Sequence, residues 1–332
     1  MSQSDVTRHG IRGDRPGREA APDALRGGPR SLVPRAEFSS YYGRPILKTP
    51  AWQARNIAGY FFLGGLAGAG SVLAAGAQLT GRNTTATAMK VSSLAAVSLS
   101  AAALVHDLGR PARFGNMLRV CKPTSPMSMG SWLLSGYGPA AGAAALSAVS
   151  GRLPRAGATA TAVAALLGPA VAAYTGVLVA DTAVPAWHEA HRELPYLFTA
   201  SATAAAAGMA LVLAPTAHTG PARCAAVLAA GAERALVRSV ERRLGMIAET
   251  YREGRAGTLM RCAAVLTAGG AAVAALLGGR GRGYAALGGL ALLAGSACTR
   301  FGVFAAGMAS AEDPVYTVAP QRARRNATRP AP

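Results

Sequence analysis

The densest group of side chains suited to acid–base chemistry lies in one short connection between two apolar segments. His106 is followed directly by Asp107, and an imidazole next to a carboxylate can take up and release protons near neutral pH. The same connection, which ends near residue 128, also carries these basic and amide residues: Arg110, Arg113, Asn116, Arg119 and Lys122. The pattern predicts proton transfer by His106 and Asp107, and basic side chains that position a partner or polarise a pocket. A purely structural alternative is an ion pair between Asp107 and Arg110 or Arg113 that closes the loop.

A second polar group follows the fourth apolar segment. Trp187, His188 and Glu189 stand together in the stretch WHEAHRE, and we expect them to contact a partner protein at the membrane surface. His188 and His191 have the spacing of a zinc-binding pair, but no third ligand is evident. Solvated histidines at the membrane interface are the simpler interpretation, and Trp187 fits an interfacial aromatic belt.

Two further pairs of polar side chains share faces of the helices that we expect beside these connections. Asn56 and Tyr60 are four residues apart, and Tyr174 and Asp181 are seven apart, so each pair lies on one helical stripe. Together with His106 they could line a pocket at the membrane edge. A quinone head group requires such a place, with a hydrogen-bond partner at each carbonyl and an acid–base route for two protons. For Tyr174, ordinary packing is the alternative.

The elements that must position these residues are membrane helices. Of the 332 residues, 51% are hydrophobic and 15% are charged, whereas about a quarter of the residues of a soluble domain are charged. Eight apolar segments are long enough to cross a hydrocarbon core of about 30 Å: residues 55–79, 86–106, 127–149, 159–181, 194–215, 218–240, 257–278 and 284–307. We therefore predict an all-α integral membrane protein with eight transmembrane helices in a bundle.

Details of single segments refine this prediction. The sixth segment is the weakest, because Glu233 and Arg234 interrupt its apolar run. Gly64 and Gly68 form a GxxxG pair in the first segment, which is typical of close helix packing in lipid. Ser125 and the proline after it predict the start of the third helix.

The chain divides into three parts by composition. Residues 1–40 are rich in Arg, Gly and Pro and lack the apolar core of a signal peptide, so we expect a disordered basic tail. Residues 41–310 form the expected membrane domain, and residues 311–332 form a C-terminal tail.

The net charge of +19 raises the question of nucleic-acid binding, which the distribution of the charge argues against. Basic residues are concentrated in the tails and in the connections near 107–126, 182–193 and 241–256, a set of segments that we name side A. The short turns at the other ends of the helices, side B, contain only seven of the 34 Lys and Arg residues: Arg82, Lys90, Arg152, Arg155, Arg223, Arg280 and Arg282. The positive-inside rule then places side A and both termini in the cytoplasm, in the inner (plasma) membrane.

The residues do not favour a metal centre in this chain. No pair of the four cysteines has CxxC spacing, which argues against an Fe–S cluster or structural zinc. Cys224, Cys262 and Cys298 are expected to be small packing residues. All five histidines lie in the tail or at helix ends, whereas haem b needs axial ligands deep between helices.

Several stretches of the sequence resemble the NrfD family, the membrane subunits of polysulfide-reductase-like molybdoenzyme complexes. The resemblance covers roughly residues 41–325, and it is most specific in the loop 106–132. The matching stretches are YYGRPILKTPAWQ, YFFLGGLAGAGS, HDLGRPARFGNMLRVCKPTSPMSMGSW, YTGVLVADTAVPAWHEAHRELP and TRFGVFAAGMASAEDPVYTVAPQR.

This resemblance implies an eight-helix subunit without haem or Fe–S of its own. It implies that menaquinone or a similar quinone binds near the face that docks an Fe–S subunit, and that this subunit exchanges electrons with a molybdopterin catalytic subunit. Tyr174 matches the family's quinone-associated tyrosine and Asn56 its polar residue at the start of the first helix, whereas Gly59 and Tyr60 stand where the family has a histidine. In polysulfide reductases the hydrophilic partners face outside, so a cytoplasmic side A implies a formate-dehydrogenase-like complex.

Two other functions remain open at this level. A proton- or solute-translocating subunit would need charged groups at mid-membrane, and the predicted helix interiors contain almost none. A structural anchor without quinone chemistry would need none of the polar residues on side A.

Overall fold

The computed structural model describes residues 5–7, 10–12, 46–47, 50, 52–107, 115–116 and 118–327, and it describes side chains from residue 46 to residue 322 of these ranges. Eight long helices dominate these residues: α1 (Ala54–Leu79), α2 (Asn83–Asp107), α4 (Pro126–Ser150), α5 (Pro154–Ala180), α7 (Leu194–Leu213), α8 (Gly220–Arg243), α10 (Gly254–Leu277) and α11 (Arg282–Glu312). Each coincides with one of the eight predicted segments, and the ends differ by a few residues. The prediction of an all-α membrane fold is confirmed.

Six of the long helices are long and apolar enough to cross a membrane: α1, α2, α5, α7, α10 and α11. The protein is therefore a multi-pass membrane protein. The other two helices are equally long but less apolar. Gly and Ser are frequent in α4, and the second half of α8 is strongly charged, with Glu233, Arg234 and Arg238.

The chain falls into two compact units. The larger unit, Ala51–Gly307, contains the helix bundle, and the other combines Met1–Pro50 with Met308–Pro332. Within the second unit, β1 (Asp5–Thr7) and β2 (Gly10–Arg12) pair antiparallel, and α12 (Val315–Ala327) forms a helix in the predicted C-terminal tail. The remainder of the predicted disordered tail lies outside the described residues.

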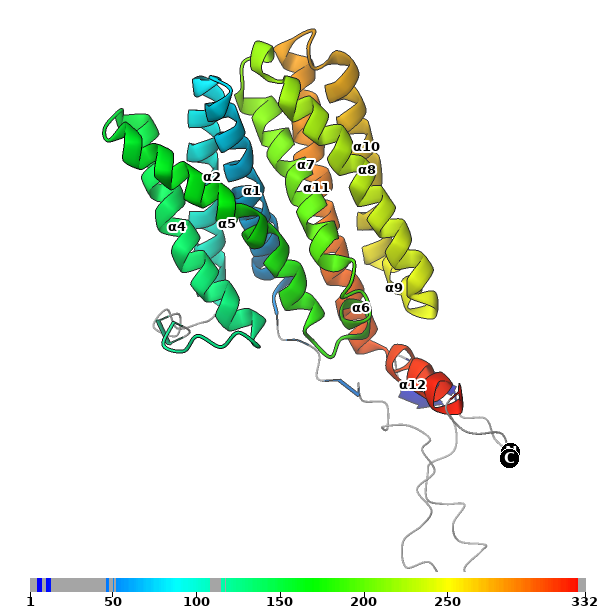
Figure 1. Cartoon of the computed structure of the whole chain (residues 1–332). Coiled ribbons are helices and arrows are strands. Elements are labelled where there is room, and N and C mark those ends of the chain that lie inside the picture. The colour runs from blue at the N-terminus through cyan, green and yellow to red at the C-terminus, as the bar shows by residue number, and fades with distance from the viewer. Residues whose placement is uncertain are drawn as a thin grey trace, which may run out of the picture. The chain divides into compact units, whose positions relative to one another are not determined.

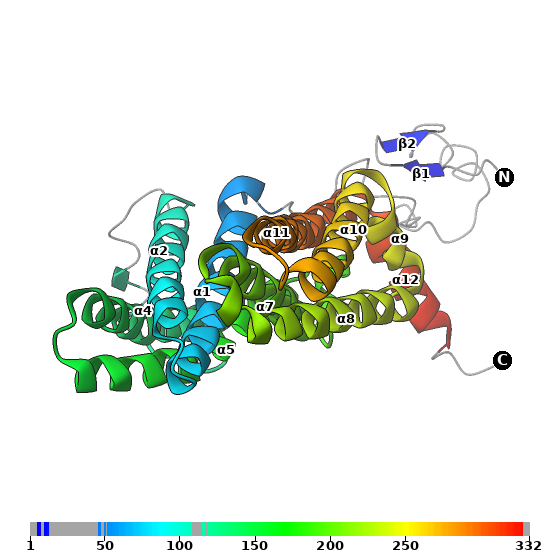
Figure 2. The same cartoon turned by 90° about the horizontal axis from the view of Figure 1, so that it is seen from above.

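Within the bundle, α1 occupies a central position. It packs against α2, α5 and α7, and Figure 1 shows these helices running side by side. Seen along the bundle, α2 and α4 lie on one flank of α1 and α7, α8, α10 and α11 on the other, while α5 crosses α1 from the α4 side toward α7 (Figure 2). The bundle thus has two halves that meet at α1.

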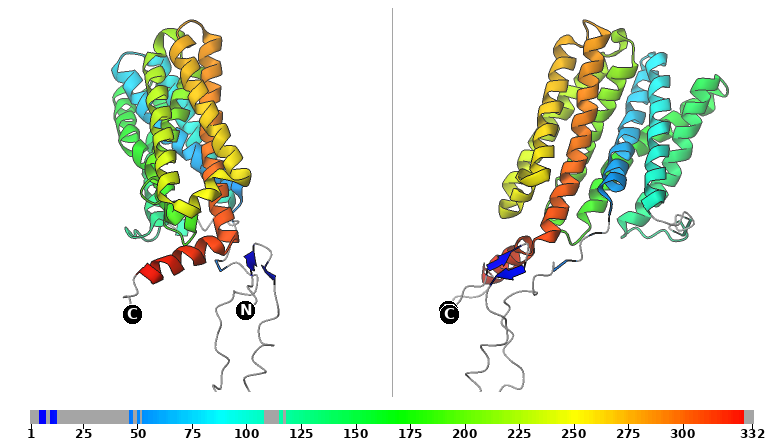
Figure 3. Two further views of the ribbon diagram at one scale, coloured as in Figure 1. Left: turned by 90° about the vertical axis from the view of Figure 1, so that its right-hand side faces the viewer. Right: turned by 180° about the vertical axis from the view of Figure 1, so that it is seen from behind.

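Short helices mark the two ends of the bundle. Between α5 and α7 lies α6 (Pro185–His188), and η3 (Gly245–Ala248) and α9 (Glu249–Arg252) lie between α8 and α10. The connections after α2, α5 and α8 are at the end where α1 begins (Figure 1, Figure 3). This end is side A, so the loops with the predicted functional residues share one face. The turn η2 (Thr216–His218) belongs to side B.

Helix ends in the bundle are closed by side chains as well as by backbone. The Ser125 side chain accepts a hydrogen bond from the Ser128 backbone N–H, and Pro126 follows it, which confirms the predicted start of α4. On side B, Arg223 Nε donates to the carbonyl of Ala274 over 2.9 Å. Arg282 donates to the carbonyl of Ala214 over 3.1 Å. Some basic residues of side B therefore serve the carbonyl ends of α10 and α7.

Helices approach most closely where glycines face each other. In three pairs, a Cβ added to one glycine would lie 2.3–3.0 Å from the carbonyl oxygen of the other: Gly68 with Gly168, Gly208 with Gly289, and Gly270 with Gly288. These pairs join α1 to α5, α7 to α11 and α10 to α11. The predicted packing role of Gly64 and Gly68 is confirmed, since a Cβ added to Gly64 would also lie only 3.3 Å from Ser100 Oγ of α2.

The contact between Gly68 and Gly168 supports a first prediction. In Gly68→Ala the added methyl group would lie 2.3 Å from the Gly168 carbonyl oxygen, which forces α1 and α5 apart. We expect a loss of about 1–3 kcal/mol in the free energy of unfolding, measured by thermal unfolding in detergent. The matched control is Gly76→Ala on the same helix, where nothing lies within 4 Å of the added atom. Equal destabilisation of both variants would refute the packing role.

Candidate functional site

Three residues that the sequence predicts as functional meet where α1 begins and α2 ends. Asn56 lies in the first turn of α1, and His106 and Asp107 are the last two residues of α2. The Asn56 side-chain nitrogen lies 3.3 Å from His106 Nδ1 and 3.4 Å from Asp107 Oδ1. The Asn56 amide nitrogen is a donor, so it can donate to the Asp107 carboxylate and, in the tautomer of His106 that leaves Nδ1 free to accept, to the imidazole. An amide, an imidazole and a carboxylate therefore form one cluster at the edge of the bundle.

Two tyrosines lie one helical turn further into the bundle. The rings of Tyr60 and Tyr174 meet edge to face, with 6.4 Å between their centroids. Tyr174 reaches α4 as well, because a Cβ on Gly130 would lie 2.3 Å from its ring. Among the described residues, the Tyr174 hydroxyl has no hydrogen-bond partner. The phenol thus remains available to a ligand.

These five residues contain the donors and acceptors that the sequence predicts. The two hollows described below are lined by other residues. Arg110 and Arg113 follow Asp107 in a segment that lies outside the described residues. The alternative interpretation, an ion pair of Asp107 with Arg110 or Arg113, therefore stays a prediction.

Other predicted site residues lie at the surface of side A. Asp181 follows α5 as its C-terminal cap and is exposed, two helical turns from Tyr174. Arg119 and Lys122 are exposed in the connection before α4, and His188 is exposed at the end of α6. Their positions allow contact with a partner.

The expectation that Trp187 lies at the surface is wrong. It is fully buried, its ring stacks on Trp52 with 5.8 Å between centroids, and its indole N–H donates to the carbonyl of Val303 over 2.8 Å. Gly307 provides the space, because a Cβ there would lie 1.8 Å from the indole. Trp187 anchors the connection between α5 and α7 inside the bundle, a position that its apolar and aromatic character permits equally well.

The histidines of this connection are held by backbone carbonyls. His188 Nδ1 lies 3.3 Å from the carbonyl of Ala180, and His191 Nδ1 lies 2.9 Å from the carbonyl of His188. In the part of the chain that the structure describes, no three His, Cys, Asp or Glu side chains converge as metal ligands.

An ion pair that the sequence did not indicate fixes the same connection to α8. Glu193 is buried, and Arg243 Nε donates to its Oε1 over 2.7 Å, with Ser239 donating to the same oxygen over 3.3 Å. Burial by itself raises the pKa of the Glu193 carboxyl, but the hydrogen bond and charge of Arg243 outweigh it and hold the pKa below its usual value. Glu193 and Arg243 are fifty residues apart, so spacing alone could not pair them.

The described interior of the bundle contains buried charged residues on three long helices, Lys90, Glu233 and Arg300, which is more than the expected near absence of charge. Arg300 is fully buried, and Glu233 is buried as well. The Arg300 guanidinium lies over the Phe198 ring at 4.0 Å and donates to the Phe198 carbonyl. The Thr299 hydroxyl donates to Glu233. Arg300 Nε and Nη1 and Glu233 Oε2 have no partner in the described part of the chain.

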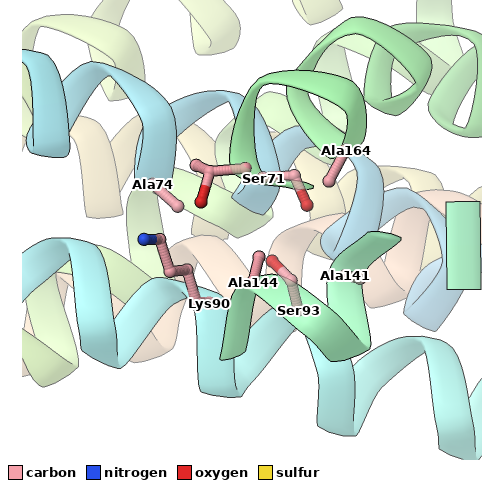
Figure 4. Close-up of a pocket in the computed structure, with 8 residues that line it drawn as sticks. Ser71, Ala74, Lys90, Ser93, Ala141, Ala144 and Ala164 are labelled. Atoms are coloured by element: carbon pink, nitrogen blue, oxygen red, sulfur yellow. The ribbon is translucent and has the colours of Figure 1, made fainter. Parts of the chain in front are cut away.

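A small polar cavity lies between α1, α2, α4 and α5 near side B. Figure 4 shows Ser71, Lys90 and Ser93 around it with four alanine side chains. Its volume is about 10 Å³, which is enough for one water molecule. Ser93 Oγ is buried without a partner among the described residues, while Ser71 and Tyr137 hydrogen-bond to each other over 2.7 Å.

The expected packing role of the cysteines is largely wrong. Cys224 and Cys262 are exposed and Cys298 is partly exposed. In a membrane protein an exposed helix face contacts lipid, which is as apolar as the packed interior. A small apolar side chain therefore does not reveal which way it points.

Comparison with known proteins identifies one family. The sequence profile described as "Polysulphide reductase, NrfD" matches residues 48–223, just over half of the 332 residues. The match contains Asn56, Tyr60, His106, Asp107 and Tyr174. No curated protein matches the chain.

The Glu193–Arg243 pair predicts a pH-dependent stability. The pKa of the Glu193 carboxyl is lower in the folded protein than its usual value of 4.5. The ionised carboxylate therefore stabilises the folded state fully above pH 4.5, and this stabilisation is lost as the pH falls through the pKa of Glu193 in the folded protein. We expect Glu193→Gln to cost about 1–2 kcal/mol at neutral pH, discounted because Arg243 is partly exposed. The difference in the free energy of unfolding between this variant and wild type should become smaller at acid pH.

The control is Glu241→Gln. Its partner Arg252 is 3.4 Å away and exposed, so the loss in the free energy of unfolding should stay below about 0.5 kcal/mol. A pH-independent cost for Glu193→Gln would contradict the assignment.

The buried charges predict non-additive substitutions. Arg300 interacts electrostatically with the buried Glu233, so Arg300→Met removes the positive charge that stabilises the Glu233 carboxylate, at a cost of about 3 kcal/mol. Adding Glu233→Gln, which retains the bond with Thr299, should recover about 1–3 kcal/mol of this loss. Thermal unfolding of the single and double variants measures both quantities. Strict additivity would show that Glu233 and Arg300 do not interact.

Proposed function

The chain belongs to the polysulphide reductase NrfD family, and on that premise we propose that it is the quinone-binding membrane anchor subunit of a molybdopterin oxidoreductase complex. It exchanges electrons between menaquinone or a similar quinone and an Fe–S partner subunit. That partner is connected in turn to a molybdopterin catalytic subunit, as in a formate-dehydrogenase-like enzyme.

One observation carries the quinone proposal: the contact of Asn56 with His106 and Asp107, 3.3 Å and 3.4 Å away. A quinone carbonyl needs a hydrogen-bond donor, and its reduction needs two protons delivered from a group that titrates near neutral pH. The Asn56 amide and the Tyr174 hydroxyl supply the donors. His106 carries the proton, and Asp107 orients the cluster and exchanges protons with the solvent on side A.

The aromatic pair behind this cluster suits the ring of the quinone. Tyr60 is almost completely buried, and its edge-to-face contact with Tyr174 fixes both rings. Asp181, at the exposed end of the same helix as Tyr174, is a second acceptor of protons at the rim of the site.

All eight long helices cross the membrane in this proposal. At 1.5 Å per residue, the 25 residues of α4 and the 24 residues of α8 extend about 36 Å, enough for a hydrocarbon core of about 30 Å. Both lie in the bundle beside helices that are apolar enough to span (Figure 3). Glu233 of α8 is buried, so its charge does not face lipid. With eight crossings, the start of α1 and the end of α11 lie on the same side of the membrane. The charge distribution assigns this side to the cytoplasm.

The Fe–S partner docks on side A, next to the quinone site. Arg119, Lys122 and His188 are exposed there, Glu189 is partly exposed, and Arg110 and Arg113 belong to the adjoining connection. A basic surface steers an acidic partner and fixes its orientation. The fully buried Trp187 stabilises this surface from below and does not contact the partner.

A proton-translocating function is the second candidate, because Arg300 and Glu233 are buried charged groups of the kind that such a function requires. The cavity beside Lys90, at about 10 Å³, admits a single water molecule and excludes a larger solute. Measuring the internal pH of proteoliposomes during quinone turnover separates proton translocation from plain electron transfer.

The experiment for the proposed function is Tyr174→Phe in the complete complex, isolated with its native partners. Loss of one hydrogen bond to the quinone should lower kcat/KM for quinone about tenfold, while turnover with a soluble electron acceptor stays unchanged. The matched control is Tyr196→Phe, because Tyr196 is an exposed tyrosine at the side A end of α7. If quinone turnover survives both substitutions unchanged, the site assignment is wrong.

A further inference from the structure

An apolar groove runs along the outside of the bundle between α1, α2 and α7. Its volume is about 490 Å³. It is lined by residues of α1 and α7 and by one long stripe of α2: Leu63, Leu66, Met209, Leu213, Ala88, Val91, Ser92, Ala95, Ala96 and Leu99. Leu99 and Val91 are 59% and 43% exposed, so the groove is open to the lipid.

The groove lies on the same helix faces as the Asn56–His106 cluster. On α2, Leu99 is seven residues before His106, and Ala95 and Ala88 continue the stripe at four and eleven residues further. On α1, Leu63 is seven residues after Asn56. Residues seven apart lie on one stripe of a helix, about 10 Å apart along its axis. The two faces that meet at Asn56 and His106 therefore continue directly into the groove.

The dimensions of the groove limit what can fill it. From Leu99 to Ala88 it extends about 16 Å along α2 at 1.5 Å per residue. An extended hydrocarbon chain of this length fits along the groove, whose volume is about 490 Å³.

We propose that the groove binds the isoprenoid tail of the quinone. This inference rests on the proposed function and adds to it the path of the tail: it leaves the head-group site at Asn56 and His106, passes Leu63 and Leu99, and runs along α2 toward side B. The end of the groove favours a quinone over a phospholipid acyl chain. The groups on its two continuing faces there are a neutral amide and an imidazole, which match a carbonyl better than a phosphate.

The tail path has a functional consequence. A tail held along α1, α2 and α7 limits how the head can rotate, and therefore directs its carbonyls at Asn56 and Tyr174. Quinones that lack the tail would still reach the head site but would bind there with less orientation. The length of the tail, and not only the head group, then contributes to substrate selection.

The test is Ala95→Trp, which fills the groove at an exposed position away from the head site. The complete complex is assayed with three naphthoquinones: one without a tail, one with a short tail and one with a full-length tail. We expect KM for the full-length tail to rise about tenfold and KM for the tail-free quinone to change less than about twofold. Ala88→Trp, at the far end of the groove, should affect the full-length tail and leave the short tail unchanged. The matched control is Ala162→Trp, at an exposed position of α5 outside the groove, and it should change none of the three.

Each other outcome has a definite meaning. Equal changes for tail-free and full-length quinones in both groove variants would overturn the tail path. So would loss of a copurified phospholipid from these variants without any dependence on tail length, because the occupant would then be a lipid. If Ala95→Trp does not assemble, Ala88→Trp decides the question by the same comparison. A wild-type complex that reduces or oxidises none of the three quinones would refute the proposed function itself, and failure of the tail path alone would leave that function intact.

Discussion

Close approach of helix backbones at glycine is the constraint on which the bundle depends. Water is absent from the hydrocarbon core, and lipid tails are as apolar as leucine, so burial of apolar side chains gives little driving force for helix association. What remains is dispersion and contact at short range. Gly68 with Gly168 and Gly208 with Gly289 each bring two backbones so near that a Cβ would lie within 2.5 Å of a carbonyl oxygen. The first pair fixes α5 to α1, and the second fixes α11 to α7.

The candidate site follows from the same constraint. Because α1 is held tightly between α2 and α5, its first turn meets the end of α2, and Asn56 comes within 3.3 Å of His106. The ring of Tyr174 lies directly on Gly130, so a missing side chain on α4 positions the phenol from α5 next to Tyr60. Where α2 and α7 are not drawn together in this way, the apolar groove remains. The close contacts of α1 with α2 and α5 thus form the proposed head-group site, and the wider spacing beside α2 and α7 leaves the groove for the proposed tail.

Polar groups inside the bundle are arranged in two separate places. Glu233 and Arg300 are buried in the half formed by α7, α8, α10 and α11, and Lys90 with Ser93 borders the one-water cavity in the other half. Buried charges without full hydrogen bonding are costly, and such costs are concentrated where a protein functions. Arg300 lies against Gly65 of α1, and the cavity beside Lys90 is lined by α1 and α2. Because α1 and α2 also carry Asn56 and His106, quinone turnover and proton movement have to be measured in the same complex.

Hydropathy and residue type predict the eight helices, the single polar end of the bundle and three residues that meet there: Asn56, His106 and Asp107. Hydropathy and chain direction are sufficient for this, because an apolar segment of spanning length has few alternatives and consecutive helices alternate in direction. Which side of each helix faces inward depends on packing between helices that are distant in the sequence. Trp187 and Arg300 are buried, Cys224 and Cys262 are exposed, and an apolar groove lies beside α2. The physical reason is that lipid and helix interior are equally apolar, so hydropathy does not distinguish the lipid-facing side of a membrane helix from its packed side.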